Sequence, residues 1–464
     1  MGSCEGGVAV LVKRTELVAA VLPVAESRLA LSNLDLLLPP LDVGIFFCYD
    51  KGSKDVNHEM RISMLKKGLC QALVPFFPLA GEVVINNEGE PVLLCNNRGV
   101  DFVQASADID LHDLDLYCPD DSIHANFVPI KKHGVFSIKV TDMKCGGLVI
   151  GCTFDHRVAD AHSINKFLVA WADITMSNNP VNNIATLYFP GDHDMVNKYV
   201  PCFRRSLLNP RKPGHYDTAI DDMYILCKTV ASNAPPLFHL QSRIYQISAY
   251  QIQLLQSLAG PKRTKFESFS ALLWKLLAKA ATEDKKQCKL GIVVDGRKCL
   301  TNSSFINNKL SIDNYFGNVL SVPYSEASAG ELKSLPLCEI ANKVHACVGS
   351  AANEEHFRGL VDWVENHRPQ PGMCKVYSIV PSETEEAAVV VSSGQRFPVT
   401  QMDYGWGRPC FGSYYFPWGG STGYVMPMPS VTNDGDWIVF MHLSPKHLDF
   451  IEKDAPHVFK PFVF

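Results

Sequence analysis

Regular hydrophobic periodicity is interrupted over residues 178–222, and this interruption limits the architectures that the chain can adopt. Strand-like and helix-like patterns precede it and resume after it, whereas the segment itself carries proline, glycine and charged residues without a period. A chain of 464 residues also exceeds what a single hydrophobic core usually holds. The sequence therefore predicts an N-terminal domain over residues 1–180, a crossover linker over 181–222 and a C-terminal domain over 223–464.

The patterns on either side predict particular elements. Apolar residues at helical spacing predict helices near residues 62–73, 164–174, 249–258, 269–277 and 337–348. Apolar or alternating runs predict strands over residues 137–143, 148–154, 242–247, 290–297, 387–394 and 437–444, the first two forming a hairpin. Strands mixed with helices of ten or more residues favour an α/β protein with mixed sheets.

Composition excludes several classes of protein. The net charge of −5 with mixed signs offers no basic surface for nucleic acid or an anionic membrane. The chain has no apolar run of about 18 residues and no secretory signal pattern. Its 15 cysteines are scattered without a C-x-x-C motif, which is typical of reduced thiols in a cytosolic protein and not of a zinc site. We therefore expect a cytoplasmic monomer with no bound metal and no nucleic-acid or membrane partner.

The segment CTFDHRVADAHS, residues 152–163, ends a predicted strand on two titratable residues, His156 and Asp160. Histidine exchanges its proton near neutral pH, so His156 suits general-base catalysis. The alternative is a structural histidine that is hydrogen-bonded to Asp160. No G-x-S-x-G nucleophile motif accompanies it, which favours base catalysis without a covalent enzyme intermediate. A second segment, DYGWGRP, residues 403–409, has two glycines that predict a tightly turned loop.

Together, HRVAD and DYGWG resemble the two signatures of the plant BAHD acyltransferase family, H-x-x-x-D and D-F-G-W-G. LSNLD at residues 31–35, FFPLAGEV, VVDGR and NYFGN at residues 314–318 also resemble strings of that family, in the same order. The resemblance spans essentially the whole chain. It implies two chloramphenicol-acetyltransferase-like domains with an active-site channel between them, which acyl-CoA enters from one face and the acceptor from the other.

The resemblance also implies roles for individual residues. His156 would remove a proton from an acceptor hydroxyl or amine, which then attacks the thioester carbonyl with no metal and no bound cofactor, acyl-CoA being a cosubstrate. Asp160 would pair with Arg297 of the second domain and hold the loop that carries His156. The residues Asp403, Tyr404, Gly405, Trp406 and Gly407 would shape the CoA side structurally. A second interpretation makes Asp403 an additional acid–base residue.

Contacts with the substrates are predicted at three further places. Lys262 and Arg263 precede a predicted helix and can meet CoA phosphate oxygens, unless they are simply a solvated surface pair. Phe46 and Phe47 fall where the family lines its acceptor pocket, although alternation lets only one of them face the channel. Gly394 stands where members that use shikimate or quinate usually have tryptophan, and this predicts open space for an aromatic acceptor such as coniferyl alcohol.

The leading prediction is thus an acyltransferase that moves a hydroxycinnamoyl, other aromatic or acetyl group from CoA to an alcohol of plant specialised metabolism. An amine acceptor is the alternative within the same class. A binding protein that keeps the fold without catalysis is the alternative from a different class, and the intact His156, Asp160 and Arg297 disfavour it. A carrier-protein-dependent condensation domain is also disfavoured, because Asp155 stands where those domains usually have a second histidine.

Overall fold

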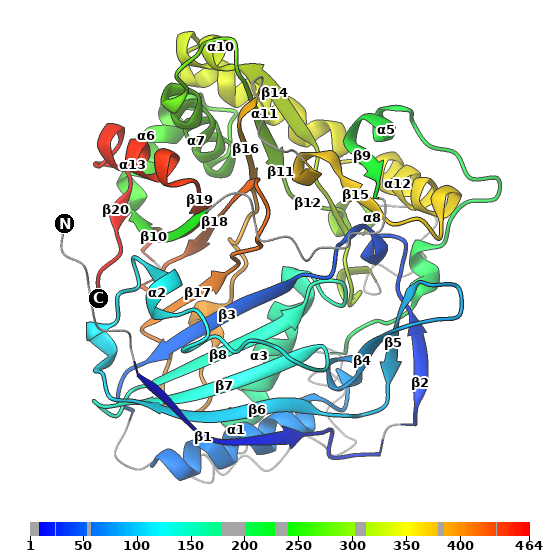
Figure 1. Ribbon diagram of the computed structural model, residues 1–464, viewed down its shortest axis with the longest axis vertical. Helices are drawn as coiled ribbons and strands as arrows, with labels where there is room; N and C mark the ends of the chain where they lie inside the picture. The colour runs from blue at the N-terminus through cyan, green and yellow to red at the C-terminus, as the bar shows by residue number, and fades with distance from the viewer. Residues whose placement is uncertain are drawn as a thin grey trace.

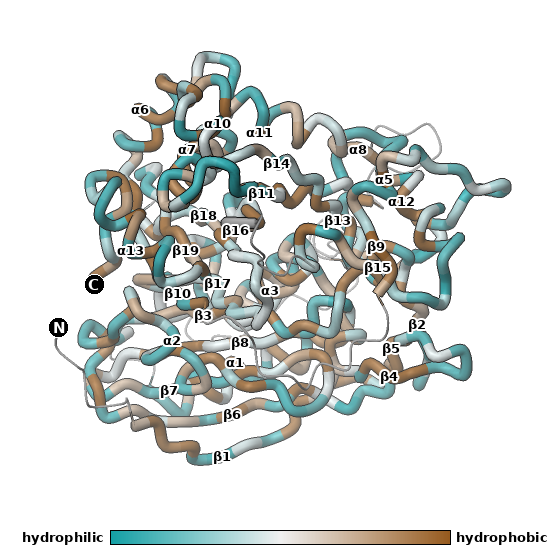
Figure 2. The backbone as a smooth tube through the Cα atoms, turned by 45° about the horizontal axis from the view of Figure 1, so that its top comes forward, coloured by the Kyte–Doolittle hydropathy of each residue, from teal (hydrophilic) through white to brown (hydrophobic). Residues whose placement is uncertain are grey.

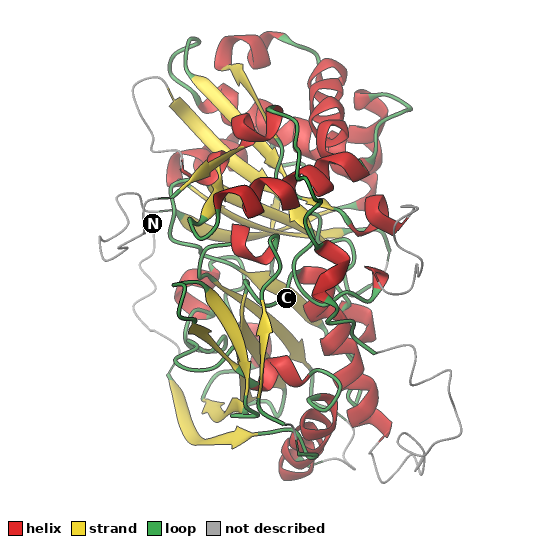
Figure 3. Cartoon of the chain, turned by 90° about the vertical axis from the view of Figure 1, so that its right-hand side faces the viewer, coloured by secondary structure: helices red, strands yellow, loops and turns green. Residues whose placement is uncertain are grey.

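The structure, a computed structural model, describes residues 9–23, 25–52, 57–177, 200–227, 240–301, 312–378, 385–432 and 434–464. Residues 181–199 of the predicted linker lie outside the described residues. The chain forms two α/β halves, each with its own large sheet and packed helices. The two groups of strands lie one above the other in Figures 1 and 3. The predicted α/β class with mixed sheets is confirmed.

The first sheet has six strands in the order β1 (Val10–Val18), β6 (Val100–Ala107), β7 (Phe136–Met143), β8 (Leu148–Asp155), β3 (Asp42–Tyr49) and β17 (Phe411–Tyr415). Neighbouring strands are antiparallel except for the parallel pair β6 and β7. Strand β17 comes from near the C-terminus, yet it pairs with β3 from Phe411↔Cys48 to Tyr415↔Gly44. The C-terminal part of the chain therefore supplies an edge strand to the N-terminal sheet (Figure 1).

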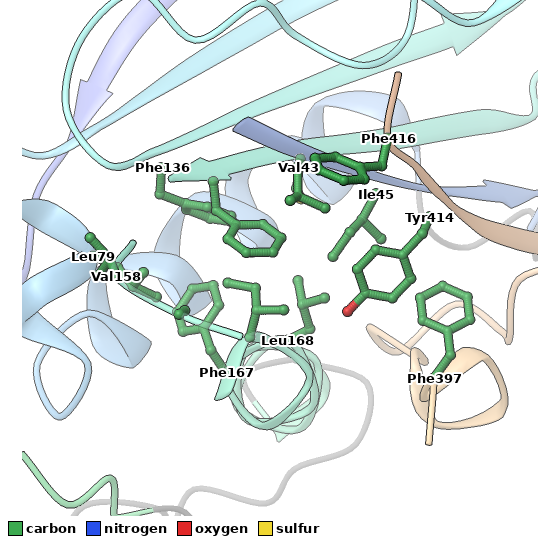
Figure 4. Close-up of a cluster of buried hydrophobic side chains, with 14 of the residues drawn as sticks. Val43, Ile45, Leu79, Phe136, Val158, Phe167, Leu168, Phe397, Tyr414 and Phe416 are labelled. Atoms are coloured by element: carbon green, nitrogen blue, oxygen red, sulfur yellow. The ribbon is translucent and has the colours of Figure 1, made fainter. Parts of the chain in front are cut away.

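Helices α1 (His58–Ala72) and α3 (Ala161–Ser177) pack together beside this sheet. Phe167 and Leu168 of α3 point toward Phe136 of β7, Ile45 of β3 and Tyr414 of β17 (Figure 4). The apolar stripe of α3 is thus buried by side chains from both ends of the chain, because β17 lies beside β3.

The second sheet has seven strands in the order β14 (Tyr324–Ser328), β11 (Gln287–Ile292), β16 (Glu385–Val391), β18 (Gly423–Pro429), β19 (Trp437–Leu443), β10 (Gln241–Ile247) and β20 (Lys460–Pro461). The helices packed in this half are α6 (Ala249–Ala259), α7 (Lys265–Ala280), α10 (Ala329–Ser334), α11 (Leu337–Ala351) and α13 (Pro445–Asp454). They share a second hydrophobic core with the sheet. Hydrophobic residues recur along the strands of both sheets (Figure 2).

Shorter elements complete the described chain. The strands are β2 (Ser27–Ala30), β4 (Glu82–Ile85), β5 (Pro91–Cys95), β9 (Tyr224–Leu226), β12 (Val294–Asp295), β13 (Leu320–Ser321) and β15 (Gly372–Cys374). The helices are α2 (Pro119–Ser122), α5 (Ala219–Met223), α8 (Arg297–Thr301) and α12 (Glu354–His367). The 3-10 turns are η1 (Asp35–Leu37), η2 (Phe77–Ala80), η3 (Leu111–Asp113), η4 (Arg205–Leu208), η5 (Lys375–Ser378) and η6 (Val399–Gln401). Within the described ranges, no helix is long and apolar enough to cross a bilayer.

Most elements predicted from local patterns are confirmed, but the strand predicted over residues 290–297 is divided into β11 and β12, and Arg297 begins α8. Strands β7 and β8 form the predicted hairpin, and α1, α3, α6, α7 and α11 cover the predicted helical segments. Ser248 caps α6, since its side chain accepts a hydrogen bond from the Gln251 amide.

Candidate active site

A cavity of about 560 Å³ is lined by residues from both halves of the molecule. The N-terminal half contributes Val43, Phe154 and His156, and the C-terminal half contributes residues such as Ile292 and Tyr424. A largely apolar cavity with a few polar groups is typical of a small-molecule site. The combination of strand ends from two halves therefore marks this cavity as the candidate site.

His156 follows β8 directly, and two backbone hydrogen bonds fix its position. Its amide donates to the Leu41 carbonyl at 2.9 Å, and its own carbonyl accepts from Asn318 Nδ2 at 2.9 Å. The ring lies 6.2 Å from the Phe154 ring and 6.4 Å from the Phe416 ring, measured between centroids. Nδ1 is buried and has no hydrogen-bond partner in the described part of the chain. No carboxylate there orients the imidazole, so the arrangement is not a histidine–aspartate pair.

Asp160 pairs with Arg297 and not with His156. Its carboxylate accepts from Arg297 Nη1 at 2.7 Å and from Arg297 Nη2 at 3.2 Å, and both residues are almost wholly buried. Arg297 Nη2 also donates to the carbonyls of Tyr315 and Gly317. Two charges removed from water in this way need close pairing and further hydrogen bonds, which this cluster supplies. The pair ties the His156 loop to the C-terminal half.

The electrostatics of this pair follow from the same contacts. Burial alone would raise the pKa of Asp160, but the adjacent Arg297 guanidinium outweighs it and holds that pKa below its usual value. Burial lowers the pKa of Arg297, whereas Asp160 and Asp295 raise it, and the net shift is upward. Both groups therefore stay charged at neutral pH.

Asp35 and Asn318 are site residues for which the sequence analysis assigned no role. Asp35 Oδ1 accepts from the Asn318 amide at 2.7 Å and from Asn318 Nδ2 at 2.9 Å, while Oδ2 accepts from the backbone and hydroxyl of Ser32. Asn318 Nδ2 in turn holds the carbonyl of His156. Their signal in the sequence is the strings LSNLD and NYFGN, which resemble strings of the BAHD family. Because Asp35 and Asn318 are 283 residues apart in the sequence, no local sequence pattern predicts that they are in contact.

The DYGWG loop lies away from the cavity and packs on the N-terminal half. The Tyr404 ring lies 4.9 Å from the Trp171 ring, and the Trp406 ring stacks on Tyr404 at 5.5 Å. Gly405 and Gly407 have φ values of 103° and 116°, which glycine alone adopts readily.

The Asp403 carboxylate stabilises the turn of this loop, because Oδ1 accepts hydrogen bonds from the amides of Gly405 at 2.8 Å and Gly407 at 3.0 Å. Asp403 does not line the cavity. This placement corrects the interpretation of Asp403 as a second acid–base residue, since its carboxylate closes a turn instead of facing a substrate.

Lys262 and Arg263 precede α7 as expected, but neither lines the cavity. Thr264, the next residue, caps α7 in a reciprocal pair with Glu267, and both of these do line it. The basic pair therefore lies one or two residues beyond the cavity wall.

Phe46 and Phe47 do not line the cavity, contrary to the expectation for one of them. Both are fully buried, because β3 lies between β8 and β17 and is covered on both faces. Phe47 stacks on Phe397 at 5.2 Å, and Phe46 packs against Phe411 at 5.7 Å. The cavity begins at the other end of the strand, at Leu41 and Val43.

Gly394 lines the cavity, but no open space lies where its side chain would be. An added Cβ would lie 2.6 Å from Met428 Cγ and 2.8 Å from the Pro427 carbonyl oxygen. The expectation of open space at this position is therefore wrong, because β18 already fills it. Among the described residues, no group of three or more His, Cys, Asp or Glu side chains could hold a metal.

Comparison with known proteins agrees with this geometry. The model of the Transferase family matches residues 8–458. Anthranilate N-benzoyltransferase protein 1 of Dianthus caryophyllus is 25% identical, and the match covers 95% of this chain and 98% of that protein. Shikimate O-hydroxycinnamoyltransferase of Nicotiana tabacum is 26% identical with the same coverage.

Two solved structures share the fold. Vinorine synthase superposes with a TM-score of 0.67 at 16% identity, covering 98% of this chain and 100% of that chain. TRI101 of F. graminearum, complexed with coenzyme A and deoxynivalenol, superposes with a TM-score of 0.73 at 15% identity, covering 93% and 98%.

Two sheet-and-helix halves around a shared cavity, with a histidine at a strand end facing it, define a two-domain acyltransferase. The family model spans nearly all of the sequence. The chain therefore belongs to the Transferase family, the BAHD acyl-CoA-dependent acyltransferases, and the chloramphenicol-acetyltransferase-like fold expected from the sequence is confirmed.

Proposed function

We propose that this enzyme transfers an aromatic or short acyl group from CoA to an alcohol, with His156 as the general base. The observation that carries the proposal is the unpaired imidazole of His156 on a cavity that both halves line. His156 takes the proton of the acceptor hydroxyl as its oxygen attacks the thioester carbonyl. The tetrahedral intermediate then breaks its C–S bond, and the proton on His156 passes to the leaving CoA thiolate.

Direct attack is favoured over an acyl-enzyme. Cys374 is on the cavity wall, but its thiol contacts the Val322 carbonyl at 3.1 Å, and burial raises its pKa to about 12. A thiol that stays protonated is a poor nucleophile. Within the described residues, no serine or cysteine forms a hydrogen bond with His156 that would activate it.

Among alcohols, we expect an aromatic one to be preferred over a polyhydroxylated ring, because part of the cavity wall is apolar. Leu34, Leu37, Leu38, Leu41 and Val43 line it there, and they offer no hydrogen bonds to a polyhydroxylated ring. We expect a coniferyl-type alcohol to have a higher kcat/KM than shikimate with the same acyl-CoA. The amine acceptor remains the second candidate, since named relatives include both N- and O-acyltransferases.

Other finer features are proposals as well. Lys262 is exposed, and Arg263 has a buried Nη1 atom without a hydrogen-bond partner in the described chain, which supports a contact with CoA phosphates near the start of α7. The net charge of −5 with mixed signs supports a protein that does not bind nucleic acid or anionic membranes, and a cytoplasmic monomer is part of the proposal.

The decisive experiment is His156→Ala. General-base catalysis typically contributes about a hundredfold or more, so CoA release should fall by at least about that factor while the melting temperature stays near wild type. His133→Ala, an exposed histidine, is the matched control. Panels of alcohols and amines with one acyl-CoA, analysed by mass spectrometry, identify the acceptor class. Near-wild-type turnover of the His156 variant would remove this residue from the mechanism.

A further inference from the structure

Four tyrosines line the cavity, and the hydroxyls of two of them already form hydrogen bonds within the protein. These are Tyr224, which bonds Ser321 Oγ and the Val322 amide, and Tyr414, which donates to Asn165 Oδ1. Their rings face the cavity, but their polar atoms are not available to a substrate. Tyr377 has no hydrogen bond to its hydroxyl in the described part of the chain, and the hydroxyl of Tyr424 interacts with the Ser392 side chain.

Tyr377 is also held in place. It lies in the 3-10 turn η5, where the Val376 carbonyl accepts from Thr422 Oγ1 at 2.7 Å. Its ring meets the Trp418 ring edge-on at 5.2 Å, and the Trp418 indole is fixed by a 2.7 Å hydrogen bond to the Thr422 carbonyl. Burial raises the pKa of Tyr377 well above its usual value, so the hydroxyl remains a donor throughout the neutral range. A preorganised donor on an otherwise apolar wall is how a pocket gains orientation and specificity.

We propose that Tyr377 is a specificity-determining residue that hydrogen-bonds an oxygen substituent on the aromatic ring of a substrate. The inference rests on the proposed function and deepens it by naming the substrate class, an aromatic compound with a ring hydroxyl or ether oxygen. That oxygen can belong to the acyl group or to the acceptor. A substrate without it leaves the hydroxyl unpaired once the cavity water is displaced, which lowers its affinity relative to the oxygenated analogue.

The test compares Tyr377→Phe with wild type on two substrate pairs that differ only by a ring hydroxyl. The acceptor pair is 4-hydroxycinnamyl alcohol and cinnamyl alcohol, and the donor pair is 4-hydroxycinnamoyl-CoA and cinnamoyl-CoA. In one pair, the variant should lower the kcat/KM ratio of hydroxylated to plain substrate about threefold to tenfold, as expected for one neutral hydrogen bond. The pair that changes identifies which substrate Tyr377 contacts. Tyr414→Phe is the matched control, because its hydroxyl donates to Asn165 Oδ1, and it should leave both ratios unchanged.

Unchanged ratios for both pairs in Tyr377→Phe would overturn the proposal, as would equal losses for all four substrates, which indicate a structural role. Failure of the proposed function is separately visible, because wild type would then transfer no acyl group to either alcohol. In that case, calorimetric binding of the same four compounds still tests Tyr377. Wild type should bind one hydroxylated compound more tightly than its plain analogue, and the variant should lose that preference.

Discussion

His156 and Asp160 lie four residues apart, but each is fixed by a different part of the C-terminal half. Asn318 holds the carbonyl of His156, whereas Arg297 binds the carboxylate of Asp160. A direct hydrogen bond between the two side chains, which was the alternative interpretation of the sequence, is absent from these described residues. The four-residue spacing of His156 and Asp160 therefore reflects the conformation of a loop, and the two residues do not form a catalytic pair.

Asp160→Asn should destabilise the enzyme by up to roughly 3–5 kcal/mol, because a neutral amide leaves the buried Arg297 charge with Asp295, at 3.3 Å, as its remaining carboxylate partner. The folded-state pKa of Asp160 is below its usual value, so its stabilisation is complete above about pH 4 and is lost as the pH falls through the lower, folded-state pKa. In thermal melts from pH 7 down to pH 3, the difference in melting temperature between wild type and variant should become smaller as the pH falls. Glu88→Gln, at an exposed carboxylate, should melt like wild type at pH 7. A stable variant with a lost rate would make Asp160 a direct participant in catalysis.

At the scale of elements, the DYGWG loop is defined by backbone conformation more than by contacts of its glycines. A Cβ added at Gly407 would have no atom within 4 Å, so only the positive φ opposes a side chain there. Its neighbours Tyr404 and Trp406 form an aromatic stack against the N-terminal half. The loop thus fastens a C-terminal segment to the first half at a place distant from the cavity.

Gly407→Ala isolates this conformational requirement. Forcing alanine into a backbone region that favours glycine should cost on the order of 1–3 kcal/mol of unfolding free energy. Gly349→Ala in α11 is a matched control, since its Cβ also meets nothing within 4 Å, and it should stabilise by about 0.5–1 kcal/mol. Denaturant titration measures the unfolding free energies of both variants. Equal effects of the two substitutions would show that the φ of Gly407 is unimportant.

Local pattern predicted the elements well because their signals lie within a few residues. The hairpin of β7 and β8 and the helix α3 each carry their own apolar periodicity. The pairing of β17 with β3 had no such signal, since Phe411 and its partner Cys48 are separated by most of the chain. The expectation for Phe46 and Phe47 came from the family resemblance, and no local pattern showed that Phe411 and Phe397 pack against them.

At the scale of the whole molecule, the C-terminal part supplies strand β17 to the N-terminal sheet, so the two halves should unfold together. Phe411 of β17 packs against Phe46 of β3 and against Phe462 near the C-terminus. Calorimetry should therefore give a single transition with equal calorimetric and van't Hoff enthalpies. Phe411→Ala should lower the free energy of unfolding by about 3–5 kcal/mol. The single transition should shift to a lower temperature and should not split in two. Two resolved transitions in wild type would mean that the halves are independent.

The position of β17 also bears on how the protein is made. The ribosome completes β3 and β8 early, but the strand that covers the free edge of β3 emerges only after residue 415. At roughly 5–20 residues per second, that edge waits on the order of tens of seconds for its partner. An uncovered edge with Phe46 and Phe47 beside it invites pairing with other nascent chains. The yield of folded protein in cells should therefore depend on chaperones that bind the first half until translation ends.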